Sequence, residues 1–282
     1  GRALFDAAAK RQVPIPVYAE MGSTNPVFIL PEMLAQKGEG IAKLLAASNM
    51  SSAGQFCTNP GIMVATRTAG AEKFYQAFGD VIRHTPSSEM LNKGIYGSFE
   101  KSMKKMEAKK SVSLLAVTDT PRQDQGELHA FSTGADDFLG DKELWEEMFG
   151  PSSVQVTATD IREMIEVALA LPGQITTSVW GTPKDLAENR ELLDILELKA
   201  GRMVINGVPT GVEVTHAMNH GGPYPATTDS KFTSVGTQSI YRFTRPVCYQ
   251  NFPQEQLPYE LKDENVLNIW RMINGQLTKE SV

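Results

Sequence analysis

Cysteine is scarce in this sequence: Cys57 and Cys248 are the only two among 282 residues. So few cysteines in a chain of this length argue against the disulfide scaffold of a small secreted domain, and we expect a reducing, cytoplasmic setting. No apolar run approaches the roughly 20 residues that a membrane-spanning helix needs. The first residues also show no apolar segment of a signal peptide. We therefore expect no association with a membrane.

Positive charge is also in short supply. The chain has 27 Lys and Arg against 33 Asp and Glu, which gives a formal net charge of −6. This balance argues against a nucleic-acid partner, since such a surface needs a basic stripe. The densest basic run lies at 101–110 and has acidic residues interleaved, as expected for the solvated face of a helix.

Several catalytic signatures are absent as well. No phosphate-binding GxGxxG or GxxxxGK motif follows an expected strand, and no Gly-x-Ser-x-Gly elbow occurs. His216 and His220 have the i, i+4 spacing of zinc ligands on a helix. However, the segment 221–223 (GGP) follows at once and disfavours a stable helix, and no carboxylate stands at a suitable offset. We expect no resident metal.

What is present is an alternation of strands and helices. This alternation predicts an α/β fold, with a twisted, mostly parallel sheet and helices on both faces. We expect strands at 113–117, 153–157, 174–180 and 203–205, and helices at 2–10, 88–109, 161–169 (with Asp160 as N-cap), 183–198 and 264–273. The alternation of strands and helices stops at 207–239, which we expect to be a loop because it has five Gly and three Pro. A loop of this length is usually functional or disordered.

Three segments contain residues suited to catalysis. Cys57 lies among small and polar residues shortly after an expected helix, where a thiolate could find positive potential and access. Glu20 lies between an apolar segment and Gly22, where a raised pKa would suit a base. Glu147 precedes 149–151 (FGP), and a carboxylate there could accept hydrogen bonds from two ribose hydroxyls. Taken singly, each has an ordinary alternative: a buried structural cysteine, a surface glutamate at a strand end, and a helix end with a Gly-Pro stop.

Taken together, these segments occur in the order typical of the aldehyde dehydrogenase superfamily. Residues 19–26 (AEMGSTNP) resemble its Glu-Leu-Gly-Gly segment, 54–58 (GQFCT) its Gly-Gln-x-Cys nucleophile segment, and 147–151 (EMFGP) its Glu-Ile-Phe-Gly-Pro segment. Residues 203–206 (MVIN) and the Gly-rich loop after them resemble its last substrate-side strand and loop. The resemblance covers essentially the whole chain and implies the catalytic domain of that superfamily.

Finer detail is similar to one subgroup. Residues 23–28 (STNPVF) replace the commoner Gly-Lys-Ser-Pro. The runs 207–224 (GVPTGVEVTHAMNHGGPY) and 245–250 (RPVCYQ) look like those of the α-ketoglutaric semialdehyde (2,5-dioxovalerate) dehydrogenases. The NADP-linked bacterial fatty-aldehyde dehydrogenases are near relatives of that subgroup.

The resemblance assigns roles residue by residue. Cys57 would attack the aldehyde to give a thiohemiacetal, hydride would pass to NAD or NADP, and Glu20 would activate the water that hydrolyses the resulting thioester. The backbone N–H of Cys57 would be one oxyanion donor. Glu147 would hold the nicotinamide ribose and Phe149 would pack near the ring. The loop residues expected to border the substrate are Gly211, Val212 and Thr215. Cys248 matches no catalytic motif, and we interpret it as structural.

Family chains run to roughly twice this length, and residues 1–2 resemble the pair just after the family's Gly-Ser phosphate-side turn. We therefore expect 1–20 to be the end of a cofactor-binding domain and 21–245 the catalytic domain. We expect 246–282 to be an extended segment and a helix, suited to oligomerisation. The adenosine pocket and the second oxyanion donor would lie upstream.

Two functional readings stay open. The chain is a segment of an active enzyme that oxidises an aldehyde, such as α-ketoglutaric semialdehyde, and forms homo-oligomers through shared sheet edges. Alternatively, it is a truncated catalytic fragment, inactive alone because the cofactor half is missing. The natural aldehyde and the choice of NAD or NADP also stay open, because the discriminating residues are expected upstream.

Overall fold

A computed structural model describes all residues, 1–282. It divides into two compact units, residues 1–242 and residues 243–282, and each is described by itself. No helix in either unit is both long enough and apolar enough to cross a membrane.

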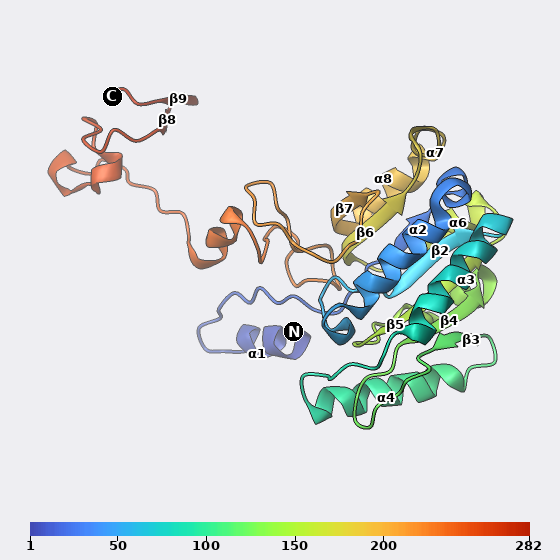
Figure 1. Cartoon of the computed structure of the whole chain (residues 1–282). Helices are drawn as coiled ribbons and strands as arrows, with labels where there is room; N and C mark the ends of the chain where they lie inside the picture. The colour runs from blue at the N-terminus through green and yellow to red at the C-terminus, as the bar shows by residue number, and fades with distance from the viewer. The chain divides into compact units, whose positions relative to one another are not determined.

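The first unit is built on a seven-stranded sheet (Figure 1). In spatial order its strands are β3 (Ser113–Val117), β4 (His129–Gly134), β5 (Ser152–Ala158), β2 (Ile62–Thr66), β1 (Val27–Ile29), β6 (Gln174–Trp180) and β7 (Ala200–Ile205). All neighbouring pairs are parallel except β3–β4. The predicted mostly parallel sheet is confirmed.

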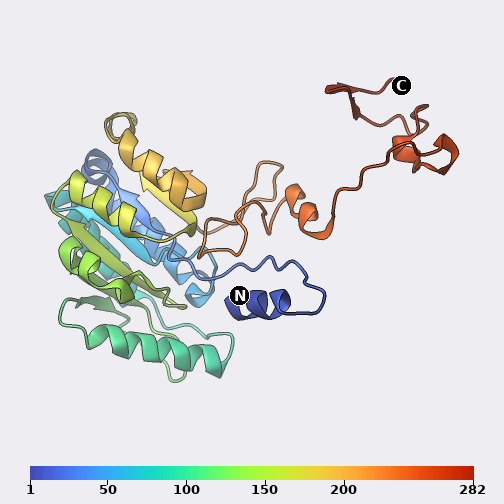
Figure 2. The ribbon, with the colours of Figure 1, turned by 180° about the vertical axis from the view of Figure 1, so that it is seen from behind.

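Helices cover both faces of this sheet, as predicted (Figures 1 and 2). The helices of this unit are α1 (Arg2–Ala9), which lies apart from the sheet, α2 (Pro31–Met50), α3 (Ala69–His84), α4 (Lys93–Glu107), α5 (Ala135–Gly140), α6 (Ile161–Ala170), α7 (Pro183–Glu188) and α8 (Arg190–Lys199). Helices α2 and α3 pack on one face, and α6 and α8 on the other. Asp160 caps α6 as expected, since its side chain accepts a hydrogen bond from the backbone N–H of Glu163.

The inner strand β1, between β2 and β6, shows why both faces need cover. Val27 and Ile29 belong to the core beneath α2 and α3, whereas Phe28 belongs to the core beneath α6 and α8. All three side chains are fully buried. Such continuous apolar runs are typical of parallel strands that are buried on both sides.

Two predicted helices have different bounds in the structure. The helix expected at 88–109 begins at Lys93, because the side chain of Asn92 accepts a hydrogen bond from the N–H of Ile95 and caps it there. The helix expected at 183–198 is two helices, α7 and α8, that meet at Asn189. The amide of Asn189 donates to the carbonyl oxygen of Asp185, which closes the first of them.

The helix predicted at 264–273 was wrong. The second unit has no α-helix; it contains short 3₁₀ turns and a hairpin of β8 (Arg271–Ile273) and β9 (Gln276–Thr278). Asn274 and Gly275 connect these strands with φ of 50° and 81°. Asn-Gly favours this left-handed turn between two strands, and here it outweighs the apolar spacing that favoured a helix.

Candidate active site

The candidate residues gather at one edge of the sheet. Cys57 lies in the segment between α2 and β2, Glu20 lies before β1, and Glu147 lies before β5. Since β1, β2 and β5 are parallel, residues that precede them meet at the same edge, where the strands begin. The chain therefore brings together side chains that are far apart in sequence.

The backbone before Cys57 makes an unusual turn. Ser52, Ala53 and Gly54 follow one another with φ of 51°, 52° and 66°, in the left-handed region that residues other than glycine rarely adopt. A Cβ on Gly54 would lie 2.2 Å from the carbonyl carbon of Gly150. The turn thus seats the cysteine segment directly on the backbone that follows Glu147.

A buried polar network fixes the chain between Glu20 and β1. The side-chain oxygen of Gln174, at the start of β6, accepts hydrogen bonds from the backbone N–H groups of Thr24 and Asn25 at 2.8 and 3.1 Å. The hydroxyl of Ser23 donates to the same oxygen at 2.9 Å. The amide of Asn25 then donates to the carbonyl oxygen of Cys57 at 2.9 Å. The segments of Glu20 and Cys57 are therefore joined through buried amides.

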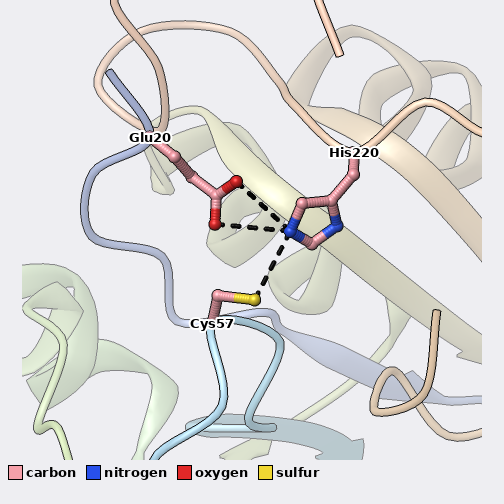
Figure 3. A group of neighbouring side chains, drawn as sticks. All are labelled: Glu20, Cys57 and His220. Carbon is pink, nitrogen blue, oxygen red and sulfur yellow. Dashed lines mark hydrogen bonds and ion pairs between the residues drawn. The ribbon is translucent and has the colours of Figure 1, made fainter. Parts of the chain in front are cut away.

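Cys57, His220 and Glu20 form a connected group (Figure 3). The Sγ of Cys57 lies 3.4 Å from Nε2 of His220, and that nitrogen lies 3.3 Å from each carboxylate oxygen of Glu20. The imidazole is buried, whereas Cys57 is exposed. The hydroxyl of Ser234 donates to the other side of the carboxylate at 2.8 Å.

These contacts set the charges of the group. Hydrogen bonds to Cys57 and Glu20 raise the pKa of His220 to about 9, against the opposing effect of burial. Burial alone would raise the pKa of Glu20, but its hydrogen bonds to His220 and Ser234 outweigh this effect and lower it. At neutral pH an imidazolium therefore lies between a carboxylate and the sulfur of Cys57.

Glu147 has the opposite electrostatic setting. Loss of solvation raises the pKa of its carboxyl group to about 7, although a backbone hydrogen bond from Ser23 acts in the other direction. The negative charge of Glu20 raises the pKa further. A Cβ on Gly22 would lie 3.0 Å from Oε2 of Glu147, so the carboxyl group rests on the Gly22 turn. Part of its surface remains open to solvent.

The other predicted site residues differ in how close they lie to this group. Phe149 is 39% exposed and lines a small cavity together with Glu147 and Ser23. The carbonyl oxygen of Gly211 accepts a hydrogen bond from Arg202 at 3.0 Å. No hydrogen bond joins Gly211, Val212 or Thr215 to Cys57. In the same loop, the hydroxyl of Thr210 lies 2.7 Å from the hydroxyl of Ser48 in α2.

His220 is the residue that sequence reasoning missed. The spacing of His216 and His220 drew attention to a helical pair, but Nδ1 of His216 bonds the hydroxyl of Thr237 instead. The true partner of His220 lies 163 residues away in the chain, so no local pattern could reveal it. Cys248, interpreted as structural, is a free and exposed cysteine of the second unit, and a packing role is therefore wrong.

This arrangement can be compared with known proteins. Residues 1–244 match the aldehyde dehydrogenase family. The chain belongs to this family. The match includes the edge of the sheet with Glu20, Cys57, Glu147 and His220.

Two curated proteins of known activity are similar to nearly the whole chain. The chain is 41% identical over 281 residues to an α-ketoglutaric semialdehyde dehydrogenase of Acinetobacter baylyi, which covers 99% of this chain and 53% of that protein. It is 40% identical over 277 residues to α-ketoglutaric semialdehyde dehydrogenase 2 of Azospirillum brasilense, again with 53% of that protein covered. The chain thus spans about half the length of the curated relatives it matches.

Solved structures share the fold. Proline utilization A of Bradyrhizobium japonicum matches 86% of this chain and 24% of its own length, with a TM-score of 0.71 and 19% identity. The γ-glutamyl-γ-aminobutyraldehyde dehydrogenase of Burkholderia cenocepacia matches 86% of this chain and 48% of its own, with a TM-score of 0.69 and 15% identity. These matches confirm the predicted fold of an aldehyde dehydrogenase catalytic domain.

Proposed function

We propose that this chain is the catalytic half of an NAD(P)-dependent aldehyde dehydrogenase, with Cys57 as its nucleophile and Glu20 as its base. The observation that carries the proposal is the group of Cys57, His220 and Glu20, in which a thiol, an imidazole and a carboxylate are in direct contact. A cysteine nucleophile beside a histidine that is itself oriented by a third group is a usual arrangement for covalent catalysis.

In the first half of the reaction the Sγ of Cys57 attacks the aldehyde carbon, and a thiohemiacetal forms on the cysteine. Nε2 of His220 lies at hydrogen-bond distance from the sulfur, at 3.4 Å. By its resemblance to the family's nucleophile segment, the backbone N–H of Cys57 would donate to the oxygen of the thiohemiacetal. A nicotinamide cofactor, when bound, would accept the hydride from the substrate carbon. With loss of the hydroxyl proton to solvent, a thioester would then remain on Cys57.

In the second half, water hydrolyses the thioester. Glu20 is ionised, because its lowered pKa lies below neutral pH, and its carboxylate can take a proton from a water molecule next to Cys57. Attack of that water on the thioester carbon breaks the carbon–sulfur bond. The products are a carboxylate and the free thiolate of Cys57, ready for a second cycle.

The residues around Glu147 fit the nicotinamide end of such a cofactor. The carboxyl group of Glu147 keeps acceptor capacity beyond its one backbone partner, Ser23, and could bind ribose hydroxyls. Phe149 presents a partly exposed ring at the same cavity. The half of the relatives' length that this chain does not span would then carry the adenosine pocket. Either NAD or NADP would satisfy the residues present.

The substrate class follows from the relatives. Both curated relatives are named for α-ketoglutaric semialdehyde, so we propose a semialdehyde of this kind as the substrate. Gly211, Val212 and Thr215, in the long loop after β7, would border it. We also propose that the protein is cytoplasmic and that it forms a homo-oligomer, as other family members do. From the sequence we propose three segments, 1–20, 21–245 and 246–282. The structure divides the chain once, after residue 242.

The alternative function is a catalytic fragment that cannot oxidise aldehydes by itself, and it is favoured by the 53% coverage of the relatives. Titration of this chain with NAD⁺ and NADP⁺ by calorimetry, with α-ketoglutaric semialdehyde oxidation measured alongside, separates the two readings. Cofactor binding with turnover would support an enzyme complete in this chain. Absence of binding would leave the chemistry of Cys57 dependent on the other half.

The thiol chemistry can be tested without a cofactor. An activated ester such as 4-nitrophenyl acetate acylates a nucleophilic cysteine directly, so it bypasses hydride transfer and yields the thioester. We expect a burst of nitrophenol followed by slower turnover. Cys57→Ser should abolish the burst, Glu20→Gln should retain the burst but slow the turnover, and Cys248→Ser should change neither. A burst that survives Cys57→Ser would refute Cys57 as the nucleophile.

A further inference from the structure

The group of Cys57, His220 and Glu20 has a second chemical property. It offers three different metal-ligand atoms: a sulfur, an imidazole nitrogen and a carboxylate oxygen. These atoms all lie within 4.8 Å of one another. They come from three separate segments, and their side chains point toward a common centre (Figure 3). Binding of a metal ion at this point would engage all three proposed catalytic side chains at once.

The distances suit one kind of ion. Zn²⁺ binds sulfur at about 2.3 Å and nitrogen or oxygen at about 2.0–2.2 Å, so tetrahedral ligand atoms stand roughly 3.4–3.6 Å apart. The separation of Sγ and Nε2 is 3.4 Å, and that of Nε2 and the carboxylate oxygens is 3.3 Å. The third pair, the sulfur and a carboxylate oxygen, lies within 4.8 Å. Mg²⁺ and Ca²⁺ prefer all-oxygen sites and do not fit this donor set.

The surroundings leave room for an ion to enter and hold the ligands in place. Cys57 is exposed, so the centre is open on the side of the thiol. The carboxylate of Glu20 is held by the hydroxyl of Ser234. The backbone N–H of His220 donates to the buried hydroxyl of Thr233 at 2.7 Å, which fixes the histidine at its Cα. Such outer contacts orient metal ligands in proteins.

We propose that Cys57, His220 and Glu20 bind one Zn²⁺ ion, and that the bound ion reversibly blocks the thiol. On binding, the protons carried by Sγ of Cys57 and by Nε2 of His220 leave to solvent as the zinc–sulfur and zinc–nitrogen bonds form, with no change of oxidation state. Water completes the fourth position, as in zinc sites with three protein ligands. The sulfur lone pair is then committed to the metal, and the carboxylate can no longer activate water. This inhibitory metal site goes beyond the proposed dehydrogenase activity and does not depend on a cofactor.

The experiment is a Zn²⁺ titration of the reduced chain, followed by calorimetry and by competition with a chromophoric chelator. We expect one ion per chain. Cys57→Ser, His220→Ala and Glu20→Gln should each weaken the affinity by about tenfold or more, since even changes to outer contacts cost about 10–100-fold. The matched controls Cys248→Ser and His216→Ala should leave the affinity unchanged, and Mg²⁺ should not compete.

Two readouts keep the proposal testable if a variant fails to fold. Co²⁺ bound to the unsubstituted chain should show thiolate charge-transfer absorption, and Cys248→Ser should retain it. Zn²⁺ should also protect Cys57, but not Cys248, from iodoacetamide, and a chelator should restore labelling. The proposal is overturned if no ion binds, if cobalt shows no thiolate band, or if affinity follows Cys248 or His216. Ester hydrolysis by the metal-free chain tests the proposed function separately, so either idea can fail without the other.

Discussion

The side-chain amide of Asn25 donates a 2.9 Å hydrogen bond to the carbonyl oxygen of Cys57. The same amide nitrogen donates to the carbonyl oxygen of Asn59, also at 2.9 Å. Asn25 is fully buried and has a φ of 45°, a left-handed conformation that asparagine tolerates better than most residues. The side chain of Asn25 thus joins two segments: the one that follows Glu20 and the loop that contains Cys57.

Asn25→Ala should lower the free energy of unfolding by about 1–3 kcal/mol, because it leaves buried carbonyl groups without a donor. Asn25→Gly provides the control, since glycine adopts positive φ freely but also lacks the amide. Urea unfolding of both variants measures the effect. If Asn25→Gly were as stable as the unsubstituted chain, the hydrogen bonds to Cys57 and Asn59 would contribute nothing measurable.

Gly54→Ala should be more damaging than its small size suggests. The added Cβ would lie 2.2 Å from the carbonyl carbon of Gly150, and Gly54 also has a φ of 66°. The loop of Cys57 would have to withdraw from the segment after Glu147, and we expect a lower melting temperature and a weaker ester burst. Gly97→Ala in α4, with no atom within 4 Å of the added Cβ, is the matched control and should not lower stability. Equal melting temperatures for the two variants would contradict this account of the turn.

Both cysteines are exposed, yet we expect iodoacetamide to label Cys57 faster than Cys248 by about tenfold or more, because positively charged surroundings make a cysteine more reactive and the imidazole of His220 lies beside Sγ of Cys57. Peptide mapping by mass spectrometry over a time course gives the two rates in one sample. His220→Gln should reduce the rate at Cys57 and leave that at Cys248 unchanged. Similar rates at the two cysteines would show that exposure alone decides their reactivity.

The carboxyl group of Glu147 should make stability depend on pH. Its pKa is about 7 in the folded chain and near the ordinary 4.5 when unfolded, so folding favours the protonated form. Its contribution is fully present below about pH 4.5 and is lost as the pH rises through about 7. The free energy of unfolding should therefore fall between about pH 5 and about pH 8, and it should fall more for the unsubstituted chain than for Glu147→Gln. Identical pH profiles for the two proteins would contradict the raised pKa.

The sequence predicts most of the sheet because its strands carry strong local signals. Residues 174–180 form β6 at the predicted bounds, since a buried strand needs an unbroken run that packs on both faces. The hairpin at 271–278 was missed because apolar spacing and turn chemistry disagreed there, and the turn at Asn274 decided the outcome.

The candidate site is harder to predict than the sheet. Cys57 and Glu20 could be proposed because their segments resemble those of a known family. His220 could not, because its contact with Cys57 arises only when the long loop after β7 folds back to the edge where the strands begin. The charge states of the two glutamates could not be predicted either. The lowered pKa of Glu20 and the raised pKa of Glu147 depend on burial and on neighbouring groups, which the sequence does not show.

The apolar run of β1 has a consequence for how the strand finds its register. A strand with one wet face cannot slip by one residue without exposing its apolar side chains. In β1, however, Val27, Phe28 and Ile29 are all apolar and all buried, so a slip would exchange one hydrophobic side chain for another. The polar bonds of Gln174 to the segment just before this strand cannot be exchanged in that way. The hydrogen bonds of Gln174 that hold the segment after Glu20 thus also fix the register of strand β1.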